Sequence, residues 1–134
     1  VDDYAHHPTE IRSTIAAARE RYPGARLWVI FQPHTYSRTK QLLDDFAAAL
    51  GDADRVVLTA IYPARETDDL GISSSDIASR ISGVPVDVVD GLEPAARFVS
   101  SNAAAGDVVL VLGAGDIWKV SDAMLAPRGQ EEDA

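Results

Sequence analysis

The stretch Val108-Val109-Leu110-Val111-Leu112-Gly113-Ala114-Gly115 decides how the rest of the sequence is interpreted. A run of apolar, mostly β-branched residues is typical of a strand that is buried on both faces. The glycines directly after it indicate a tight turn, and Asp116 suits the start of a helix over residues 116–125. A doubly buried strand followed by a helix is the repeating unit of a parallel sheet.

The same unit recurs along the chain. Strands are predicted over residues 27–31, 56–61, 86–89 and 108–112, with a first strand that ends just before Asp2. Helices are predicted over residues 8–21, 35–50, 75–81, 92–104 and 116–125, and a longer loop over residues 63–74. This alternation predicts an α/β fold: a doubly wound, mostly parallel sheet of about five or six strands with helices on both faces.

Size and composition match a single globular domain of 134 residues, 46% of them hydrophobic. We place the domain at residues 1–126 and predict that the acidic tail, residues 127–134, is disordered. The chain begins with Val1 and not with Met, which suggests a piece of a longer protein.

The charge and the lack of cysteine exclude several classes of protein. Without cysteine there is no disulfide scaffold, zinc finger or thiol catalysis, and a cytoplasmic setting fits. The net charge of -9 would repel a duplex, so no nucleic-acid partner is expected. No apolar run approaches the ~20 residues that span a bilayer, so no membrane partner is expected either.

Unusual polar residues follow one predicted strand after another. Ligands of open α/β sheets bind beyond the carboxyl ends of the strands, so these residues are expected to share one edge. They are Asp2, Asp3, Tyr4, His6 and His7; Gln32, His34, Thr35, Tyr36, Ser37 and Arg38; Tyr62, Arg65 and Glu66; and Gly113-Ala114-Gly115-Asp116. Loops are polar in any protein, and helix caps would explain Thr35 and Asp116.

The histidines have two interpretations. His6 and His7 could bind a metal together with His34, but adjacent residues of an extended chain point to opposite sides and rarely reach one ion. We therefore predict no metal site, with His7 capping the next helix or packing and His6 as the better ligand contact.

Arg38 also has two interpretations. At a helix N-terminus, with His34 and Ser37 beside it, its guanidinium suits a carboxylate or phosphate. It could equally form a surface ion pair with Asp44 or Asp45.

The sequence provides weaker evidence for a nucleotide-binding site. The Gly113-Ala114-Gly115 turn is only a fragment of a dinucleotide fingerprint, and no GxxxxGK[ST] loop occurs in these residues.

Two long motifs, Asp2-Asp3-Tyr4-Ala5-His6-His7-Pro8-Thr9-Glu10 and Phe31-Gln32-Pro33-His34-Thr35-Tyr36-Ser37-Arg38-Thr39, resemble the C-terminal domain of the Mur ligases. Tyr62-Pro63-Ala64-Arg65-Glu66 and Gly113-Ala114-Gly115-Asp116-Ile117 match the same family in the same order. The resemblance covers nearly the whole chain. It is strongest with the members that join L-alanine to UDP-N-acetylmuramate.

The resemblance implies a Rossmann-like third domain of a cytoplasmic enzyme of peptidoglycan synthesis. In that family the first domain binds the UDP-sugar, and the central one holds the P-loop, ATP and Mg²⁺. ATP phosphorylates the UDP-N-acetylmuramate carboxylate, and the amine of L-alanine attacks the acyl phosphate to give an amide, ADP and phosphate. The third domain closes over the other two and is expected to be inactive alone, with no catalytic residue of its own.

Site residues are implied position by position. Asp3 matches the acid that hydrogen-bonds the ATP ribose, whereas Tyr4, His6 and Arg38 match contacts around L-alanine, with Arg38 on its carboxylate. His34 and Thr35 are secondary candidates. Some relatives carry a second arginine where this chain has Thr35, so we expect the carboxylate clamp to consist of Arg38 and helix N–H groups. The roles of Arg65 and Asp116 stay open.

Three alternatives remain. One is the recycling ligase that joins UDP-N-acetylmuramate to a preformed tripeptide, although residues 33–38 favour the L-alanine enzyme. Another is a stand-alone α/β ligand-binding module. The third is a metal-dependent hydrolase that uses the histidines.

Overall fold

A computed structural model describes residues 2–3 and 7–113 of the chain. Its strands are β1 (Asp2–Asp3), β2 (Leu27–Phe31), β3 (Arg55–Leu58), β4 (Val86–Val88) and β5 (Val108–Leu112). Its helices are α1 (Pro8–Arg21), α2 (Tyr36–Gln41), α3 (Leu43–Leu50), α4 (Ser74–Ala78) and α5 (Leu92–Asn102). The strands form one five-stranded sheet in the order β1-β5-β2-β3-β4, and every pairing is parallel. The predicted α/β class and parallel sheet are confirmed, with the lower of the two expected strand numbers.

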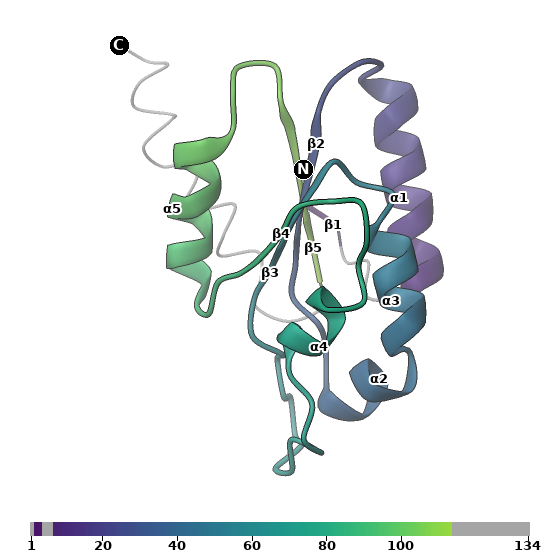
Figure 1. The fold of residues 1–134 in the computed structure, drawn as a ribbon, viewed down its shortest axis with the longest axis vertical. Helices are drawn as coiled ribbons and strands as arrows, with labels where there is room; N and C mark the ends of the chain where they lie inside the picture. Colours follow the sequence, from purple (N-terminus) through teal and green to yellow (C-terminus); the bar gives the residue numbers. More distant parts are fainter. Residues whose placement is uncertain (1, 4–6, 114–134) are drawn as a thin grey trace.

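Alternate residues of the central strand face opposite layers of the molecule. Leu27, Val29 and Phe31 belong to one buried cluster, with residues of α1, α3 and α4, whereas Trp28 and Ile30 belong to a second cluster with α5. In Figure 1 α5 lies on one side of the sheet and α1 and α3 lie on the other. All five residues of β2 are fully buried, as a strand covered on both faces requires.

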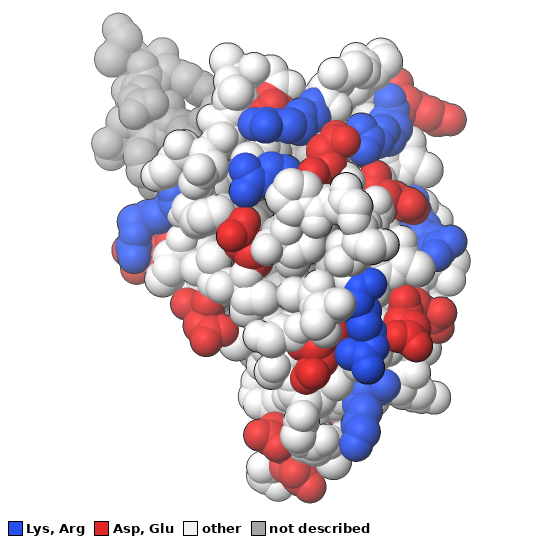
Figure 2. Space-filling view, viewed as in Figure 1, with Lys and Arg blue, Asp and Glu red and all other residues white. Residues whose placement is uncertain are grey.

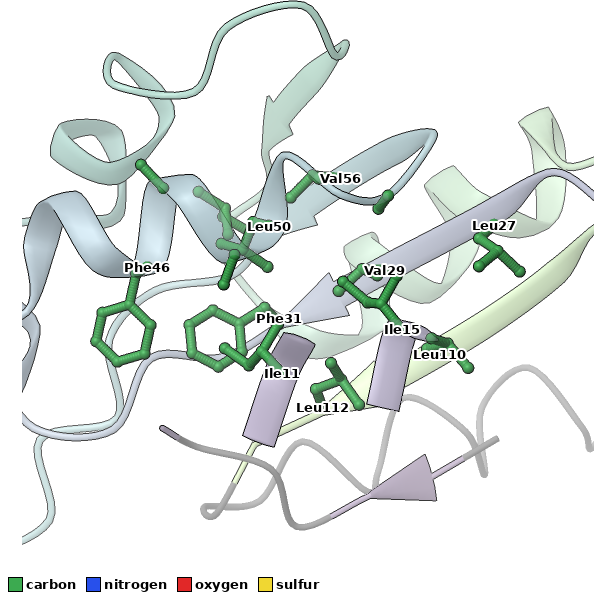
Figure 3. Packing of buried hydrophobic residues seen from close by; sticks show 14 of the residues in the cluster. Ile11, Ile15, Leu27, Val29, Phe31, Phe46, Leu50, Val56, Leu110 and Leu112 are labelled. Atoms are coloured by element: carbon green, nitrogen blue, oxygen red, sulfur yellow. The ribbon is translucent and has the colours of Figure 1, made fainter. Parts of the chain in front are cut away.

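The larger cluster is held together by the aromatic and aliphatic side chains drawn in Figure 3. Phe31 of β2 and Phe46 of α3 meet with ring centroids 5.3 Å apart and planes tilted by 38°. Ile11 and Ile15 of α1 pack onto the same face, and both are buried. Their spacing of four residues confirms the helical periodicity predicted for residues 8–21.

One helix was predicted over residues 35–50, and that prediction is wrong. The chain forms two helices, α2 and α3, and bends between them at Leu42, where φ is −110° and ψ is 22°. The only buried residue of α2 is Thr39, whereas α3 buries Phe46, Ala47, Ala49 and Leu50. The two segments therefore contribute differently to the interior, and the backbone at Leu42 separates them.

Other boundaries shift by a few residues. Asp2 and Asp3 pair with Val111 and Leu112, so they form the first strand and do not follow it. The strand predicted over residues 56–61 is Arg55–Leu58, because the chain leaves the sheet after Thr59, whose carbonyl accepts the Ser74 hydroxyl at the start of α4. The helix predicted over residues 116–125 and the tail at 127–134 lie outside the described residues.

Candidate functional site

The carboxyl ends of four strands meet at one edge of the sheet. Asp3 is level with Leu112, and Phe31 is level with both Leu112 and Leu58. The segments that follow Phe31 and Leu58 therefore leave the sheet side by side. In Figure 1 α2 and the loop before α4 lie at this edge, at the lower end of the view. The predicted grouping at one edge is confirmed for Asp3 and for the segments that follow β2 and β3, and its use as a ligand site stays a prediction.

Beyond the strands, the chain after β2 keeps contact with the chain after β3. Tyr62 N–H donates to the Pro33 carbonyl, and Thr35 N–H donates to the Tyr62 carbonyl, both at 2.8 Å. These bonds form an isolated parallel bridge between His34 and Tyr62, whose rings stack with centroids 5.7 Å apart. The half-buried His34 is thus held against an aromatic ring of the neighbouring segment.

Thr35 has an unusual backbone conformation directly before α2. Its φ is 66° and its ψ is 146°, a region that glycine tolerates and a β-branched residue rarely adopts. Its hydroxyl accepts the Arg38 N–H at 3.3 Å, and its carbonyl accepts the Thr39 hydroxyl at 2.7 Å. The predicted role of Thr35 as a helix cap is confirmed.

Glu66 is a site residue whose role the sequence did not reveal. Its carboxylate accepts the backbone N–H of Tyr36, the backbone N–H of Ser37 at 3.1 Å and the hydroxyl of Ser37. The Ser37 hydroxyl, followed by the two N–H groups, holds the pKa of Glu66 below its usual value although partial burial opposes this. The sequence did contain one signal for this role. Glu66 is an acidic residue that follows β3, and β3 lies next to β2, the strand that precedes α2.

The first N–H groups of α2 are therefore all occupied from within the described chain, by Glu66 and by the Thr35 hydroxyl. The expectation that these N–H groups help to clamp an external carboxylate is wrong for this structure. A cap formed by a glutamate satisfies the same donors that a ligand would use. The guanidinium of Arg38, in the same turn, forms no ion pair with a described carboxylate.

Arg38 lies half-buried in the first turn of α2, and no described carboxylate is within ion-pair distance of it. The alternative interpretation, an ion pair with Asp44 or Asp45, is wrong. Asp44 pairs with Arg80, which follows α4, at 3.0 Å, and Asp45 forms no ion pair among residues 2–3 and 7–113.

The surface charges do not separate by sign on the face drawn in Figure 2, where acidic and basic side chains are interspersed.

The remaining candidates divide between described and undescribed residues. Nδ1 of His7 accepts the Thr9 N–H at 3.2 Å while Glu10 bonds back to the His7 N–H, so the capping role predicted for His7 is confirmed. The backbone of Asp3 ends β1 at the site edge. Tyr4, His6 and Asp116 lie outside the described residues.

A metal site would need a cluster of ligating side chains, and a membrane span would need a long apolar helix. Within residues 2–3 and 7–113, no three His, Cys, Asp or Glu side chains gather closely enough to hold a metal ion. Within the same residues, no helix has the length and apolar character needed to cross a bilayer.

Comparison with known proteins identifies the family. The family model described as "Mur ligase, glutamate ligase domain" matches residues 1–115. UDP-N-acetylmuramate–L-alanine ligases of Lachnospira eligens and Frankia casuarinae are 51% and 49% identical over 127 and 137 residues. The alignments cover 93% and 96% of this chain but only 28% and 27% of those proteins, so the chain spans just over a quarter of their length.

Solved structures agree with this result. The UDP-N-acetylmuramate-alanine ligase of Thermotoga maritima superposes with a TM-score of 0.69 at 30% identity, over 97% of this chain and 26% of that one. A murein peptide ligase of Psychrobacter arcticus has a TM-score of 0.73 at 23% identity, over 92% of this chain and 26% of that one, which shows a shared fold alone. With a family match over residues 1–115, the chain belongs to the Mur ligase family as its glutamate ligase domain.

Proposed function

We propose that the chain is the C-terminal domain of an ATP-dependent ligase that joins L-alanine to UDP-N-acetylmuramate in cytoplasmic peptidoglycan synthesis. Support comes from relatives named UDP-N-acetylmuramate–L-alanine ligase, whose sequences are about half identical to this one over nearly the whole chain. The domain contributes contacts to L-alanine and to the ATP ribose. The acyl phosphate forms and is consumed at a site shared with the N-terminal and central domains, which are its partners within the enzyme.

Arg38 is the observation that carries the proposal. Arg38 belongs to α2, a helix fixed by several hydrogen bonds at the edge of the sheet predicted to bind ligands, and it forms no ion pair with a described carboxylate. A planar guanidinium binds a carboxylate through two parallel hydrogen bonds. Arg38 would hold the L-alanine carboxylate so that the amine faces the acyl phosphate, which lowers the entropic cost of the attack.

His34 lies near Arg38 along the chain, and its ring is fixed against Tyr62. We assign His34 and Thr35 a secondary role beside the amino acid, and Tyr4 and His6 the direct contacts that the family resemblance implies. Thr35 is already engaged as the cap of α2, so its contribution is to the shape of the turn more than to the ligand.

Asp3 is the proposed contact to the ATP ribose. It is the last residue of β1, level with Leu112, so it ends at the same edge as the Arg38 segment. A carboxylate is a suitable acceptor for ribose hydroxyls. The described residues do not fit a Mg²⁺ site, because no cluster of three metal-ligating side chains occurs among them. We therefore assign Mg²⁺ and the ATP phosphates mainly to the central domain.

A substrate comparison in the full-length enzyme tests the proposal. Release of phosphate from ATP in the presence of UDP-N-acetylmuramate should require L-alanine, and the product should be the L-alanyl amide. The tripeptide-recycling ligase is the second candidate, because the family resemblance leaves it open as an alternative. Turnover with the preformed tripeptide but not with L-alanine would reject the proposal in favour of that enzyme.

A further inference from the structure

The start of α2 is built by a segment from another part of the chain. Tyr62 and Glu66 supply the partners of the Thr35, Tyr36 and Ser37 N–H groups. The 62–66 segment is itself folded back, since Glu66 N–H donates to the Pro63 carbonyl at 3.0 Å and Ala64 has a φ of 56°. The turn that carries Arg38 is thus held from outside its own helix.

A short helix with a strained entry needs such support. The helix α2 has six residues and buries only Thr39, so neither length nor apolar packing fixes it strongly. The positive φ of Thr35 is a strained conformation, which persists only where the surrounding structure holds it in place. The hydrogen bonds to Tyr62 and Glu66 hold this conformation in place.

We propose that Glu66 is a positioning residue for the amino-acid substrate: its carboxylate fixes the first turn of α2 and thereby aims the Arg38 guanidinium. This inference rests on the proposed function of Arg38. Glu66 itself contacts Tyr36 and Ser37 and not the substrate. Its side chain belongs to neither buried cluster, so the effect of its removal falls on local order and not on the core.

The role assigned to Glu66 differs from that of a generic helix cap in what it controls. A cap that only stabilises the fold lowers the melting temperature and affects all substrates through the amount of folded enzyme. A residue that aims Arg38 affects the substrate that Arg38 binds. The apparent KM for L-alanine therefore separates the two roles, while the KM for ATP serves as an internal control.

The test is a double-mutant cycle in the full-length ligase with Glu66→Ala, Arg38→Ala and the combined variant. We expect Glu66→Ala to raise the apparent KM for L-alanine at least about tenfold, within the ~100-fold that a misplacement of 1 Å can cost, and to change the KM for ATP less than about twofold. Glu66→Gln keeps one acceptor oxygen and should recover part of the loss. In the Arg38→Ala background, Glu66→Ala should have no further effect.

Glu93→Ala is the matched control, because Glu93 is an exposed carboxylate paired with Arg97 within α5, on the other side of the sheet from α1 and α3. Equal KM values for L-alanine in Glu66→Ala and Glu93→Ala would overturn the inference. So would an effect of Glu66→Ala that persists in full without Arg38, since Glu66 would then act by another route. If Arg38→Ala leaves the L-alanine KM unchanged, the proposed clamp itself is wrong, and the role of Glu66 falls with it.

Amide hydrogen exchange adds a readout that does not depend on turnover. In Glu66→Ala the amides of Tyr36 and Ser37 lose their acceptors and should exchange at least about tenfold faster, whereas amides of α5 should not change. Unchanged protection of these two amides would mean that Glu66 does not hold the turn, and would overturn the inference independently of the kinetics.

Discussion

Replacement of Asp107 by alanine should destabilise the domain from the end opposite to the ligand site. One oxygen of Asp107 accepts four hydrogen bonds: from Nε and Nη2 of Arg26 at 3.1 and 2.7 Å, from Trp28 Nε1 at 2.9 Å and from the Ala104 N–H at 2.8 Å. The Asp107 side chain is only 9% exposed, and Trp28 is fully buried. The carboxylate therefore joins the start of β2 to the loop before β5.

The expected loss follows from what alanine leaves behind. The indole N–H of the buried Trp28 would have no acceptor, which costs about 1–3 kcal/mol. The ion pair with the half-exposed Arg26 adds no more than about 1 kcal/mol, because solvent screens it. The sum is about 1–4 kcal/mol, which for a domain of this size lowers the melting temperature by roughly 5–15 °C.

Urea unfolding of the 134-residue chain, followed by circular dichroism, measures the difference. Asp52→Asn is the control, because Asp52 is exposed and its side chain makes no hydrogen bond or ion pair within residues 2–3 and 7–113. A loss below about 1 kcal/mol in Asp107→Ala would refute the reasoning, since water would then satisfy the Trp28 indole as well as the carboxylate does.

The stabilisation by Asp107 should also depend on pH. The hydrogen bonds from Arg26, followed by that from the Ala104 N–H, lower the pKa of Asp107 from 3.8 to about 2. Because the folded-state pKa is depressed, the contribution is complete above the unfolded value and is lost as the pH falls from about 4 towards 2. The difference in unfolding free energy between the parent chain and Asp107→Ala should shrink over that interval, and a constant difference would contradict this assignment.

The remaining predictions concern the ligand site. Arg38→Lys in the full-length ligase keeps the charge but loses the two-pronged geometry, so the apparent KM for L-alanine should rise at least about fivefold in steady-state assays while the KM for ATP stays the same. Asp3→Asn should raise the KM for ATP and leave that for L-alanine unchanged, and an effect confined to L-alanine would reject the ribose contact. The 134-residue chain alone should form no amide from ATP, UDP-N-acetylmuramate and L-alanine, because its sequence lacks a P-loop; product detected by mass spectrometry would contradict this.

The sheet was predictable because the central strand β2 buries both faces and the neighbouring strands β3 and β5 are largely buried as well. Runs such as Leu27–Phe31 and Val108–Leu112 are apolar throughout, and few other structures place five successive apolar residues in the interior. The break at Leu42 was not predictable in the same way. Leu42, Leu43 and Phe46 continue a helical pattern without interruption, so periodicity shows no end to the first helix. The bend arises from tertiary contacts of the flanking segments, which local patterns do not encode.

The site was partly predictable for a related reason. A parallel topology brings the residues that follow its strands to one edge, so Asp3, His34, Arg38 and Tyr62 could be grouped without coordinates. Glu66 also belongs to that group, but its hydrogen bonds connect it to the start of α2, which is far from it in sequence. No spacing rule predicts which carboxylate caps which helix. For this reason the sequence predicts a ligand on the N–H groups of α2, which Glu66 occupies in the structure.

Among the described arginines that form no ion pair with a described carboxylate, Arg12, Arg21 and Arg65 are exposed, whereas Arg38 is half-buried. Five arginines form ion pairs with described carboxylates: Arg19, Arg26, Arg55, Arg80 and Arg97. Arg26 lies at the amino edge of the sheet, where Asp107 satisfies it from within the chain. Arg38 lies at the carboxyl edge, half-buried on a helix whose nearby carboxylate, Glu66, is bound to backbone N–H groups and to Ser37 instead. A half-buried guanidinium next to a carboxylate committed elsewhere is suited to a carboxylate that arrives with a substrate.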